Sequence, residues 1–531
     1  MRTNRRLHGV LALASLAAVA MVMGGQAPPT VEPEVRAPIL PRPDPKEIPL
    51  PVIKTDMKPM PGVDQLPNRP EMPDVMTLNN GQKVKTPKQW EQRRVEMTNT
   101  LNWYALGEAP PPPGNVKGTE VHSELVLDGK YKYRLVHLTF GPNSSLSLDV
   151  GIFAPVDNNH VPTVISIGGS PPGATPLPRL AQGANQGRNE DVLLVTGPAA
   201  PGAGGPGGFG GGRAPGAGAP GGAANAAGAG AARAAGVPGA PAGAGGAGAS
   251  ARPAGGPGGP GGGGFARRPQ TPESIAQMNQ AIQHGYAYVV FNNGDCGEDS
   301  TLRLADGSWA YRTTRFFPAY PNYDWGLLRA WAWGTSRVVD YLETDPSVDH
   351  SKFIVTGVSR TGKAALVAGA YDDRIAVVAP VASSGGGTPA YRYSGSVPDR
   401  GGKEGLTEMV RKYPNWYSDH LHQFWGQPDK LPFDEHWLIA LCAPRPMIAL
   451  EGTRDQNVNQ NGVYHSLVAA KPAYEFLHAG DKIGISFADR MHGEVQGDWD
   501  AMFAFADEFL MGKPTTRTFD QYPPGMGPNA K

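Results

Sequence analysis

The stretch from 353 to 365 constrains the fold most, because it reads as a buried strand, a sharp turn and a helix in immediate succession. A β-branched run at 353–356 leads into Gly-Val-Ser, and an Ala-rich run suited to a helix follows. Such a turn can hold a serine hydroxyl out as a nucleophile, although a serine that only caps a helix is the simpler alternative. The usual pattern is G-x-S-x-G, but here Thr361 fills the fifth position and the glycine follows at Gly362. The flanking strand and helix favour Ser359 as a nucleophile.

Runs typical of strands alternate with runs typical of helices along much of the remaining chain. The expected strands cover 123–126, 131–140, 146–154, 163–167, 286–291, 353–358, 375–379, 446–450 and 482–487. The expected helices cover 86–106, 271–284, 324–342, 463–469 and 499–510. Strands that alternate with helices form a mainly parallel sheet with helices on both faces. Together with the serine turn, this pattern predicts an α/β-hydrolase fold with a doubly wound sheet.

The two ends and one internal stretch lack this alternation. Residues 1–26 combine a basic start with a short apolar run, which predicts a signal peptide and a secreted or periplasmic protein; an uncleaved anchor is the alternative. Proline recurs through 27–80, which we expect to be an extended linker. Gly, Ala and Pro dominate 198–268, which predicts a disordered insertion. This insertion would lie inside a catalytic domain at 81–515, followed by a C-terminal tail at 516–531.

Charge and cysteine content exclude some classes of partner. Basic and acidic residues number 48 each, so nothing directs the chain toward nucleic acid or, after signal cleavage, toward a membrane. Cys296 and Cys442 could form one disulfide in an exported protein or remain buried thiols. His420 and His422 beside Asp419 could ligate a metal, but hydrogen-bonded histidines are the commoner case. We expect no metal, no cofactor and a monomer.

Three residues match the requirements of acyl transfer by serine. The serine needs a base that takes its proton and a carboxylate that orients the base. In the predicted fold these groups follow the order serine, acid, histidine. Ser359, Asp455 and His492 have this order, and each follows an expected strand at the end where active sites form. Asp455 alone could cap a helix and His492 alone could be a surface histidine, but their joint placement predicts a triad.

The segment Gly-Val-Ser-Arg-Thr-Gly-Lys at 357–363 resembles the G-x-S-R-x-G-K motif of the glucuronoyl (4-O-methyl-glucuronoyl) methylesterases, carbohydrate esterase family 15, bacterial type. The resemblance runs from about residue 90 to residue 510. Further matching segments are 291–295, 324–326, 331–333, 413–416, 431–436 and 443–446. The resemblance implies that Arg360 adds a cationic donor to the oxyanion hole. It also implies that Lys363 binds sugar hydroxyls and that Glu404 contacts the uronate. Arg360 and Lys363 could instead be cations on a helix surface.

Two positions depart from the pattern of this family. Many members place the catalytic acid where this chain has Ser383, whereas bacterial relatives can carry it after the later strand, at the position of Asp455. The family usually has a sugar-stacking tryptophan just after this acid, and this chain has Gln456 and Asn457 instead. The aromatic platform is therefore missing from its expected position.

The resemblance implies a serine esterase that hydrolyses esters of (4-O-methyl-)glucuronic acid through an acyl-enzyme. Its partner would be glucuronoxylan or a related uronate ester, as in xylan–lignin linkages. One alternative is a carboxylesterase or acetyl xylan esterase of different specificity. Another is a sugar-binding protein that keeps the hydrolase fold without turnover. The missing tryptophan favours altered specificity, and the intact Ser, Asp and His argue against an inactive binder.

Overall fold

The computed structural model describes residues 57–158, 160–180, 276–304, 307–393 and 404–529, together with the backbone of a short strand, β1 (Val35–Arg36). The predicted signal peptide at 1–26 and the predicted insertion at 198–268 lie outside the described residues. So does most of the predicted linker before residue 57.

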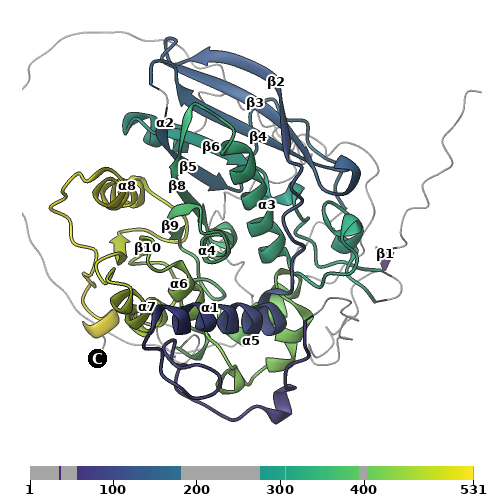
Figure 1. Cartoon of the computed structure of the whole chain (residues 1–531), viewed down its shortest axis with the longest axis vertical. Coiled ribbons are helices and arrows are strands. Elements are labelled where there is room, and N and C mark those ends of the chain that lie inside the picture. Colours follow the sequence, from purple (N-terminus) through teal and green to yellow (C-terminus); the bar gives the residue numbers. More distant parts are fainter. Residues whose placement is uncertain are drawn as a thin grey trace, which may run out of the picture.

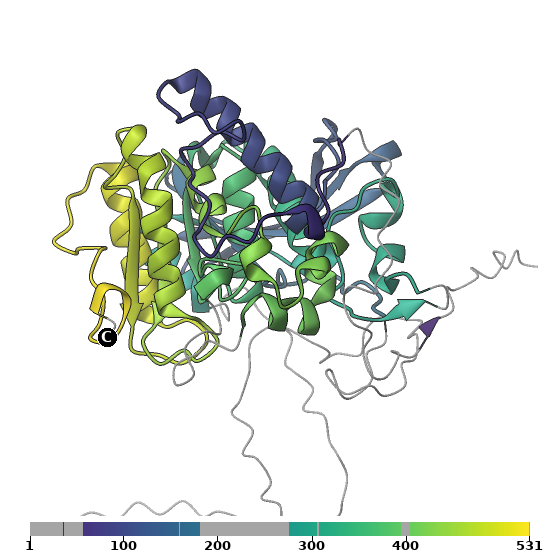
Figure 2. The same ribbon diagram turned by 90° about the horizontal axis from the view of Figure 1, so that it is seen from below.

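Within this part of the chain, nine strands form one sheet in the order β11-β10-β9-β8-β5-β6-β4-β3-β2. Strands β4, β3 and β2 join by antiparallel pairing, whereas β6, β5, β8, β9, β10 and β11 run parallel to one another. The antiparallel strands and the C-terminal strands lie at opposite ends of the molecule (Figures 1 and 2). The strand bounds are β2 (Lys117–Val126), β3 (Tyr131–Phe140), β4 (Leu146–Pro155), β5 (Val161–Ile167), β6 (Ala287–Phe291), β8 (Val348–Val358), β9 (Ile375–Val381), β10 (Met447–Gly452) and β11 (Ile483–Ala488). The predicted mainly parallel sheet is confirmed.

The helices cover both faces of this sheet. Helices α3, α4, α6 and α7 pack in succession on one face, whereas α2 contacts β6 and α8 contacts β9, β10 and β11. The helix bounds are α1 (Pro87–Leu101), α2 (Ala276–Gln283), α3 (Leu327–Leu342), α4 (Arg360–Tyr371), α5 (Leu406–Lys412), α6 (His436–Cys442), α7 (Gln460–Phe476) and α8 (Gln496–Met511). In the described part of the chain, no helix is both long enough and apolar enough to span a bilayer. The α/β-hydrolase architecture predicted from the alternation is therefore present.

Local chemistry explains why these elements form where they do. Thr86 caps α1 by accepting a hydrogen bond from the Gln89 backbone N–H, and Pro87 occupies the first helical position. Strand β6 is buried throughout, and most of β5 and the second half of β8 (353–357) are buried as well, with mainly apolar residues, as in central parallel strands. Strand β3 alternates buried and half-buried residues, because one of its faces is less covered.

The segment 57–80, which we expected to be part of an extended linker, packs against the domain. Val75 and Leu78 are buried in the core, and the Arg93 side chain donates hydrogen bonds to the carbonyls of Val75 and Asp74. The Tyr104 hydroxyl donates to the Pro61 carbonyl at 2.6 Å. An irregular proline-rich chain leaves carbonyls free for such donors, and a few apolar side chains are enough to bury it. The expectation of a linker is corrected for these residues.

The C-terminal segment after α8 covers the outer side of β11, which is an edge strand of the sheet. The Ile485 backbone N–H donates to the Phe519 carbonyl at 2.7 Å. The Phe519 ring meets Phe505 of α8 edge-on, with 5.0 Å between the ring centroids. Part of the predicted tail is therefore packed on the domain.

Cys296 and Cys442 are both buried free thiols, so no disulfide joins them. Burial raises the pKa of Cys442 to about 11 and also raises the pKa of Cys296. Of the two alternatives for these cysteines, the structure supports buried apolar thiols.

Candidate active site

Ser359 occupies the strained turn between β8 and α4. Its backbone has φ +59° and ψ −118°, a conformation that costs energy for a residue other than glycine and that is concentrated at functional sites. The Ser359 N–H donates to the Val381 carbonyl at 2.9 Å, which fixes the turn to the end of β9. The predicted strand, turn and helix are therefore all present around this serine.

The shifted glycine of the motif has a steric reason. A Cβ on Gly362 would lie 2.7 Å from the Val381 carbonyl oxygen and 2.9 Å from that of Gly357, so this position admits no side chain without movement. Thr361, at the usual glycine position, instead uses its hydroxyl to accept from the Val358 N–H at 2.9 Å. The hydroxyl also lies 2.9 Å from the Val358 carbonyl, to which it donates. The position where neighbouring backbone leaves no room for a side chain is thus Gly362, one residue later than the last glycine of G-x-S-x-G.

Asp455 and His492 lie in the loops after β10 and β11 and contact each other. The His492 Nδ1 is 2.8 Å from the Asp455 Oδ2, the Asp455 side chain is fully buried, and that of His492 is 17% exposed. The second Asp455 oxygen accepts from the Asn457 backbone N–H at 2.9 Å. This pairing orients the ring and leaves Nε2 for proton transfer.

All three residues lie at the same edge of the sheet. Strands β8, β10 and β11 are parallel, so the loops that follow them and carry Ser359, Asp455 and His492 leave at their carboxyl ends. Strand β9 lies between β8 and β10. The structure thus joins the predicted acid to the predicted base and places the serine turn at the edge that carries both.

Arg360 does not extend freely from the helix surface. Its guanidinium forms an ion pair with Asp299, and the group lies 5.7 Å from the centroid of the Trp416 ring. Asp299 belongs to the loop after β6. Its contact with Arg360 therefore links that loop to the turn of Ser359 between β8 and α4, called the nucleophile turn below.

Lys363 is fully buried, which excludes the alternative that it is a cation on a helix surface. Its ammonium group donates to the Ser384 hydroxyl at 2.6 Å, and that hydroxyl donates to Glu404 at 2.5 Å. Lys363 and Glu404 lie 3.6 Å apart. Burial lowers the pKa of Lys363, and the negative charge of Glu404 opposes this change. The two residues expected to bind the sugar are therefore brought together, with Ser384 between them.

A second buried acid lies near the pair of Asp455 and His492, and the sequence analysis did not identify it. Glu451 in β10 is fully buried and accepts a hydrogen bond from the Thr388 hydroxyl at 3.0 Å. The Thr388 hydroxyl lies 2.8 Å from that of Ser383, the position where many relatives carry the acid. Burial raises the pKa of Glu451 to about 8; Arg490 opposes the rise and Asp455 adds to it. A glutamate in an otherwise apolar strand was the available signal.

The histidines beside Asp419 have structural partners. His420 stacks on Trp103 with 4.5 Å between ring centroids, and His422 Nε2 lies 2.9 Å from the Pro414 carbonyl oxygen. Asp419 accepts from the Trp309 indole N–H at 2.9 Å. Burial lowers the pKa of both histidines. Among the described residues, no group of three or more His, Cys, Asp or Glu side chains is arranged to hold a metal ion.

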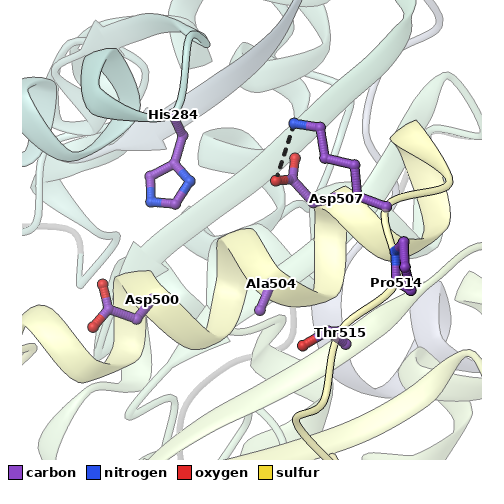
Figure 3. Close-up of a pocket in the computed structure, with 7 residues that line it drawn as sticks. His284, Asp500, Ala504, Asp507, Pro514 and Thr515 are labelled. Atoms are coloured by element: carbon purple, nitrogen blue, oxygen red, sulfur yellow. Dashed lines mark hydrogen bonds and ion pairs between the residues drawn. The ribbon is translucent and has the colours of Figure 1, made fainter.

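A surface hollow of about 410 Å³ lies between the residue that follows α2, the helix α8 and the segment just after α8 (Figure 3). Its lining residues are His284, Asp500, Ala504, Asp507, Lys513, Pro514 and Thr515. His284 comes just before β6 begins, so this hollow lies toward the amino ends of the parallel strands, away from the serine turn.

Comparison with known proteins agrees with this architecture. Residues 270–478 match the family described as "Glucuronyl esterase, fungi". The chain is 32% identical over 251 residues to carbohydrate esterase MZ0003 from an unknown prokaryotic organism, covering 44% of this chain and 56% of that protein. It is 35% identical over 245 residues to a 4-O-methyl-glucuronoyl methylesterase of Phanerochaete carnosa, covering 45% and 58%. The chain thus spans just over half the length of these curated relatives.

Solved structures extend the similarity to most of the chain. A promiscuous CE15 esterase from a marine bacterial metagenome aligns with a TM-score of 0.60 and 22% identity, covering 84% of this chain and 99% of that one. A CE15 glucuronoyl esterase from Caldicellulosiruptor kristjansonii aligns with a TM-score of 0.55 and 26% identity, covering 85% and 93%. In sequence motif, family match and fold, the chain is similar to the glucuronoyl esterases of carbohydrate esterase family 15.

Proposed function

We propose that this protein is a serine esterase that hydrolyses esters of glucuronic or 4-O-methyl-glucuronic acid, as in xylan–lignin linkages. One observation carries the proposal: a buried aspartate holds His492 at 2.8 Å, at the sheet edge where the strained turn presents Ser359. A strained serine and an oriented imidazole at one edge are the requirements of acyl transfer. Similarity to esterases of this family supports the reaction class.

The proposed mechanism assigns each step to a named group. The Ser359 hydroxyl attacks the ester carbonyl while His492 Nε2 takes its proton, and the carbonyl electrons move to the oxygen. The Arg360 side chain and backbone N–H groups stabilise that oxyanion. The intermediate collapses, His492 gives its proton to the departing alcohol, and the uronoyl group remains on Ser359. Water, deprotonated by His492, then attacks the acyl carbon; the bond to Ser359 Oγ breaks, His492 returns the proton to Oγ, and the uronate leaves. Asp455 holds the imidazole and stabilises its charged form.

The choice of a uronate as substrate rests on relatives and on the buried pair beside the turn. A related glucuronoyl esterase from Sporotrichum thermophile, 21% identical, was solved with methyl 4-O-methyl-β-D-glucopyranuronate. We assign recognition of the sugar to Lys363 and Glu404. The Ser384 hydroxyl links these two side chains by hydrogen bonds, and Lys363 lies in the first turn of α4, directly after Ser359. Charged groups fixed by such contacts can bind sugar hydroxyls with little reorganisation.

A second candidate is an esterase of different specificity, such as an acetyl xylan esterase. The observation that favours it is the sequence after Asp455, where Gln456 and Asn457 replace the aromatic residue expected from the family pattern. Without a stacking platform, selection of a sugar ring depends on hydrogen bonds alone. The triad chemistry would be the same.

We also infer that the protein is exported and acts as a monomer. The basic and apolar start at residues 1–26 supports export. In this proposal the catalytic domain spans the predicted 81–515, extended by the packed segment 57–80 and by the packed part of the tail at 516–531.

Hydrolysis of benzyl glucuronate by the wild type and by Ser359→Ala tests the proposal. We expect the variant to lose at least about 10³-fold in kcat, and Asp455→Asn to lose about 10²–10⁴-fold. Ser351→Ala is the matched control. Ser351 is an exposed serine near the start of β8, the strand that leads to Ser359, and this variant should retain activity. An aryl acetate and an acetylated xylan are measured in parallel.

Each outcome separates the candidates. Turnover of the glucuronate that depends on Ser359 supports the uronate esterase. Cleavage of the acetates without cleavage of the glucuronate would keep the triad and refute the substrate. Absence of all turnover would refute the esterase and favour the sugar-binding protein.

A further inference from the structure

The carboxylate of Asp299 is shared between the arginine next to the nucleophile and a neighbouring loop. Its Oδ2 pairs with the Arg360 guanidinium. Its Oδ1 accepts hydrogen bonds from the Asn415 amide at 2.9 Å and from the Trp416 indole N–H at 2.8 Å. One carboxylate thus binds the arginine with one oxygen and is fixed by two neutral donors with the other.

The ring of Trp416 adds a second restraint on the cations of the site. Its centroid lies 5.7 Å from the Arg360 guanidinium carbon and 5.5 Å from the Lys363 ammonium nitrogen. Trp416 is buried, and Tyr413 stacks on it with 4.0 Å between centroids and 7° between planes. An aromatic face at this distance attracts a cation. The ring that donates to Asp299 therefore also lies beside Arg360.

These contacts limit the freedom of a side chain that must act at one point in space. An unrestrained arginine side chain loses conformational entropy when it is fixed in one rotamer. Groups that stabilise a transition state act best when they are oriented before the reaction. The ion pair engages Nη1 of a guanidinium that carries five N–H donors, so others can point to the oxyanion.

We propose that Asp299 is a positioning residue that aims the Arg360 guanidinium at the oxyanion of the transition state, and that Asn415 and Trp416 fix Asp299 for this purpose. This inference rests on the proposed esterase function and on the assignment of Arg360 to the oxyanion. It predicts that loss of the Asp299 charge lowers kcat more than it changes KM, because the interaction matters most in the transition state.

A double-mutant cycle tests whether Asp299 acts through Arg360. The variants are Asp299→Asn, Arg360→Met and the double variant, with kcat and KM measured on benzyl glucuronate and on an aryl acetate. We expect Asp299→Asn to lower kcat about 10–100-fold in the wild-type background, and less than about 3-fold when Arg360 is already methionine. Asp299→Glu should recover part of the lost kcat.

A matched control removes another carboxylate from an ion pair. Asp349→Asn breaks the contact with Lys352 at 3.0 Å in β8 and should leave kcat unchanged. Thermal unfolding of each variant shows whether the fold is kept. If Asp299→Asn does not fold, Trp416→Phe keeps an aromatic ring at this position and removes the hydrogen bond from the indole N–H to Asp299. The same dependence on Arg360 is then expected for Trp416→Phe, with a smaller loss of kcat.

Two results would overturn the inference. One is an unchanged kcat in Asp299→Asn, or in Trp416→Phe where that variant replaces it. The other is an equal loss of kcat in both backgrounds, which would assign Asp299 a structural role independent of Arg360. Both differ from failure of the proposed function, in which the wild type itself shows no turnover that depends on Ser359.

Discussion

Glu451 lies in β10 next to the loop of Asp455, and its carboxyl group is held away from water. Burial raises its pKa from 4.5 to about 8, because a charged carboxylate is poorly solvated there. The nearby Arg490 opposes this rise, while Asp455 and Asp498 add to it. One oxygen accepts from Thr388, and the other has no hydrogen-bond partner in the structure. We therefore expect a protonated, neutral Glu451 in the folded protein at neutral pH.

The raised pKa makes stability depend on pH in a defined direction. Between pH 4.5 and about 8 the unfolded chain releases this proton and the folded protein keeps it, so the free energy of unfolding falls as pH rises. The stabilising contribution is fully present below pH 4.5 and is lost as pH approaches 8. One titrating group changes stability by about 1.4 kcal/mol per pH unit, so about 3 kcal/mol is lost between pH 5.5 and pH 7.5.

Glu451→Gln isolates this contribution, because glutamine keeps an oxygen for Thr388 and does not titrate. The free energy of unfolding is measured by urea denaturation at pH 5.5 and pH 7.5. The variant should gain about 3 kcal/mol relative to the wild type over this interval. In Glu91→Gln, which removes an exposed carboxylate of α1, the difference from the wild type should stay constant. If wild type and Glu451→Gln instead differ in stability by the same amount at both pH values, Glu451 does not keep its proton in the folded protein over this range.

Two further predictions follow from the nucleophile turn and the helix after it. Gly362→Ala should destabilise the fold by about 1–3 kcal/mol and lower kcat, because its Cβ would lie 2.7 Å from the Val381 carbonyl oxygen. Urea denaturation and turnover measure this, with Gly497→Ala in α8 as a comparison, because its added Cβ would lie 3.7 Å from the nearest atom, an ordinary contact distance. Equal behaviour of the two variants would contradict the steric argument. Lys363→Met should lower kcat/KM on benzyl glucuronate about 10–100-fold and much less on an aryl acetate, because it removes a charge-assisted contact to the sugar. Equal losses on both substrates would show that Lys363 supports the turn rather than the sugar.

Local patterns were enough to predict the sheet, the serine turn and the candidate triad. The run before Ser359 is apolar and β-branched, and the run after it is rich in alanine, so both elements follow from short-range preferences. The contact of His492 with Asp455 followed from a rule of topology, since the carboxyl ends of parallel strands share an edge. Neither prediction needed knowledge of side-chain packing.

Contacts between distant loops could not be predicted in this way. Asp299 meets Arg360 only because the loop after β6 folds onto the nucleophile turn, and no periodic signal marks that approach. The link from Glu451 through Thr388 to Ser383 likewise joins two loops and a strand. The packing of residues 57–80 depends on a few single apolar side chains such as Val75. The overall composition of this segment is rich in proline and polar residues, so it does not indicate that these side chains are buried.

The covering of β11 by the C-terminal segment means that residues beyond α8 help to protect the strand that leads to His492, the proposed base. An edge strand presents unpaired N–H and C=O groups to any other strand that approaches. Here the Phe519 carbonyl takes the Ile485 N–H, and Gly484 leaves room for the Phe519 side chain. A chain shortened to residue 511 would retain every proposed catalytic residue. It would also expose the edge of β11, the strand that leads to His492. We expect the exposed edge to promote self-association and the loop of His492 to become less ordered.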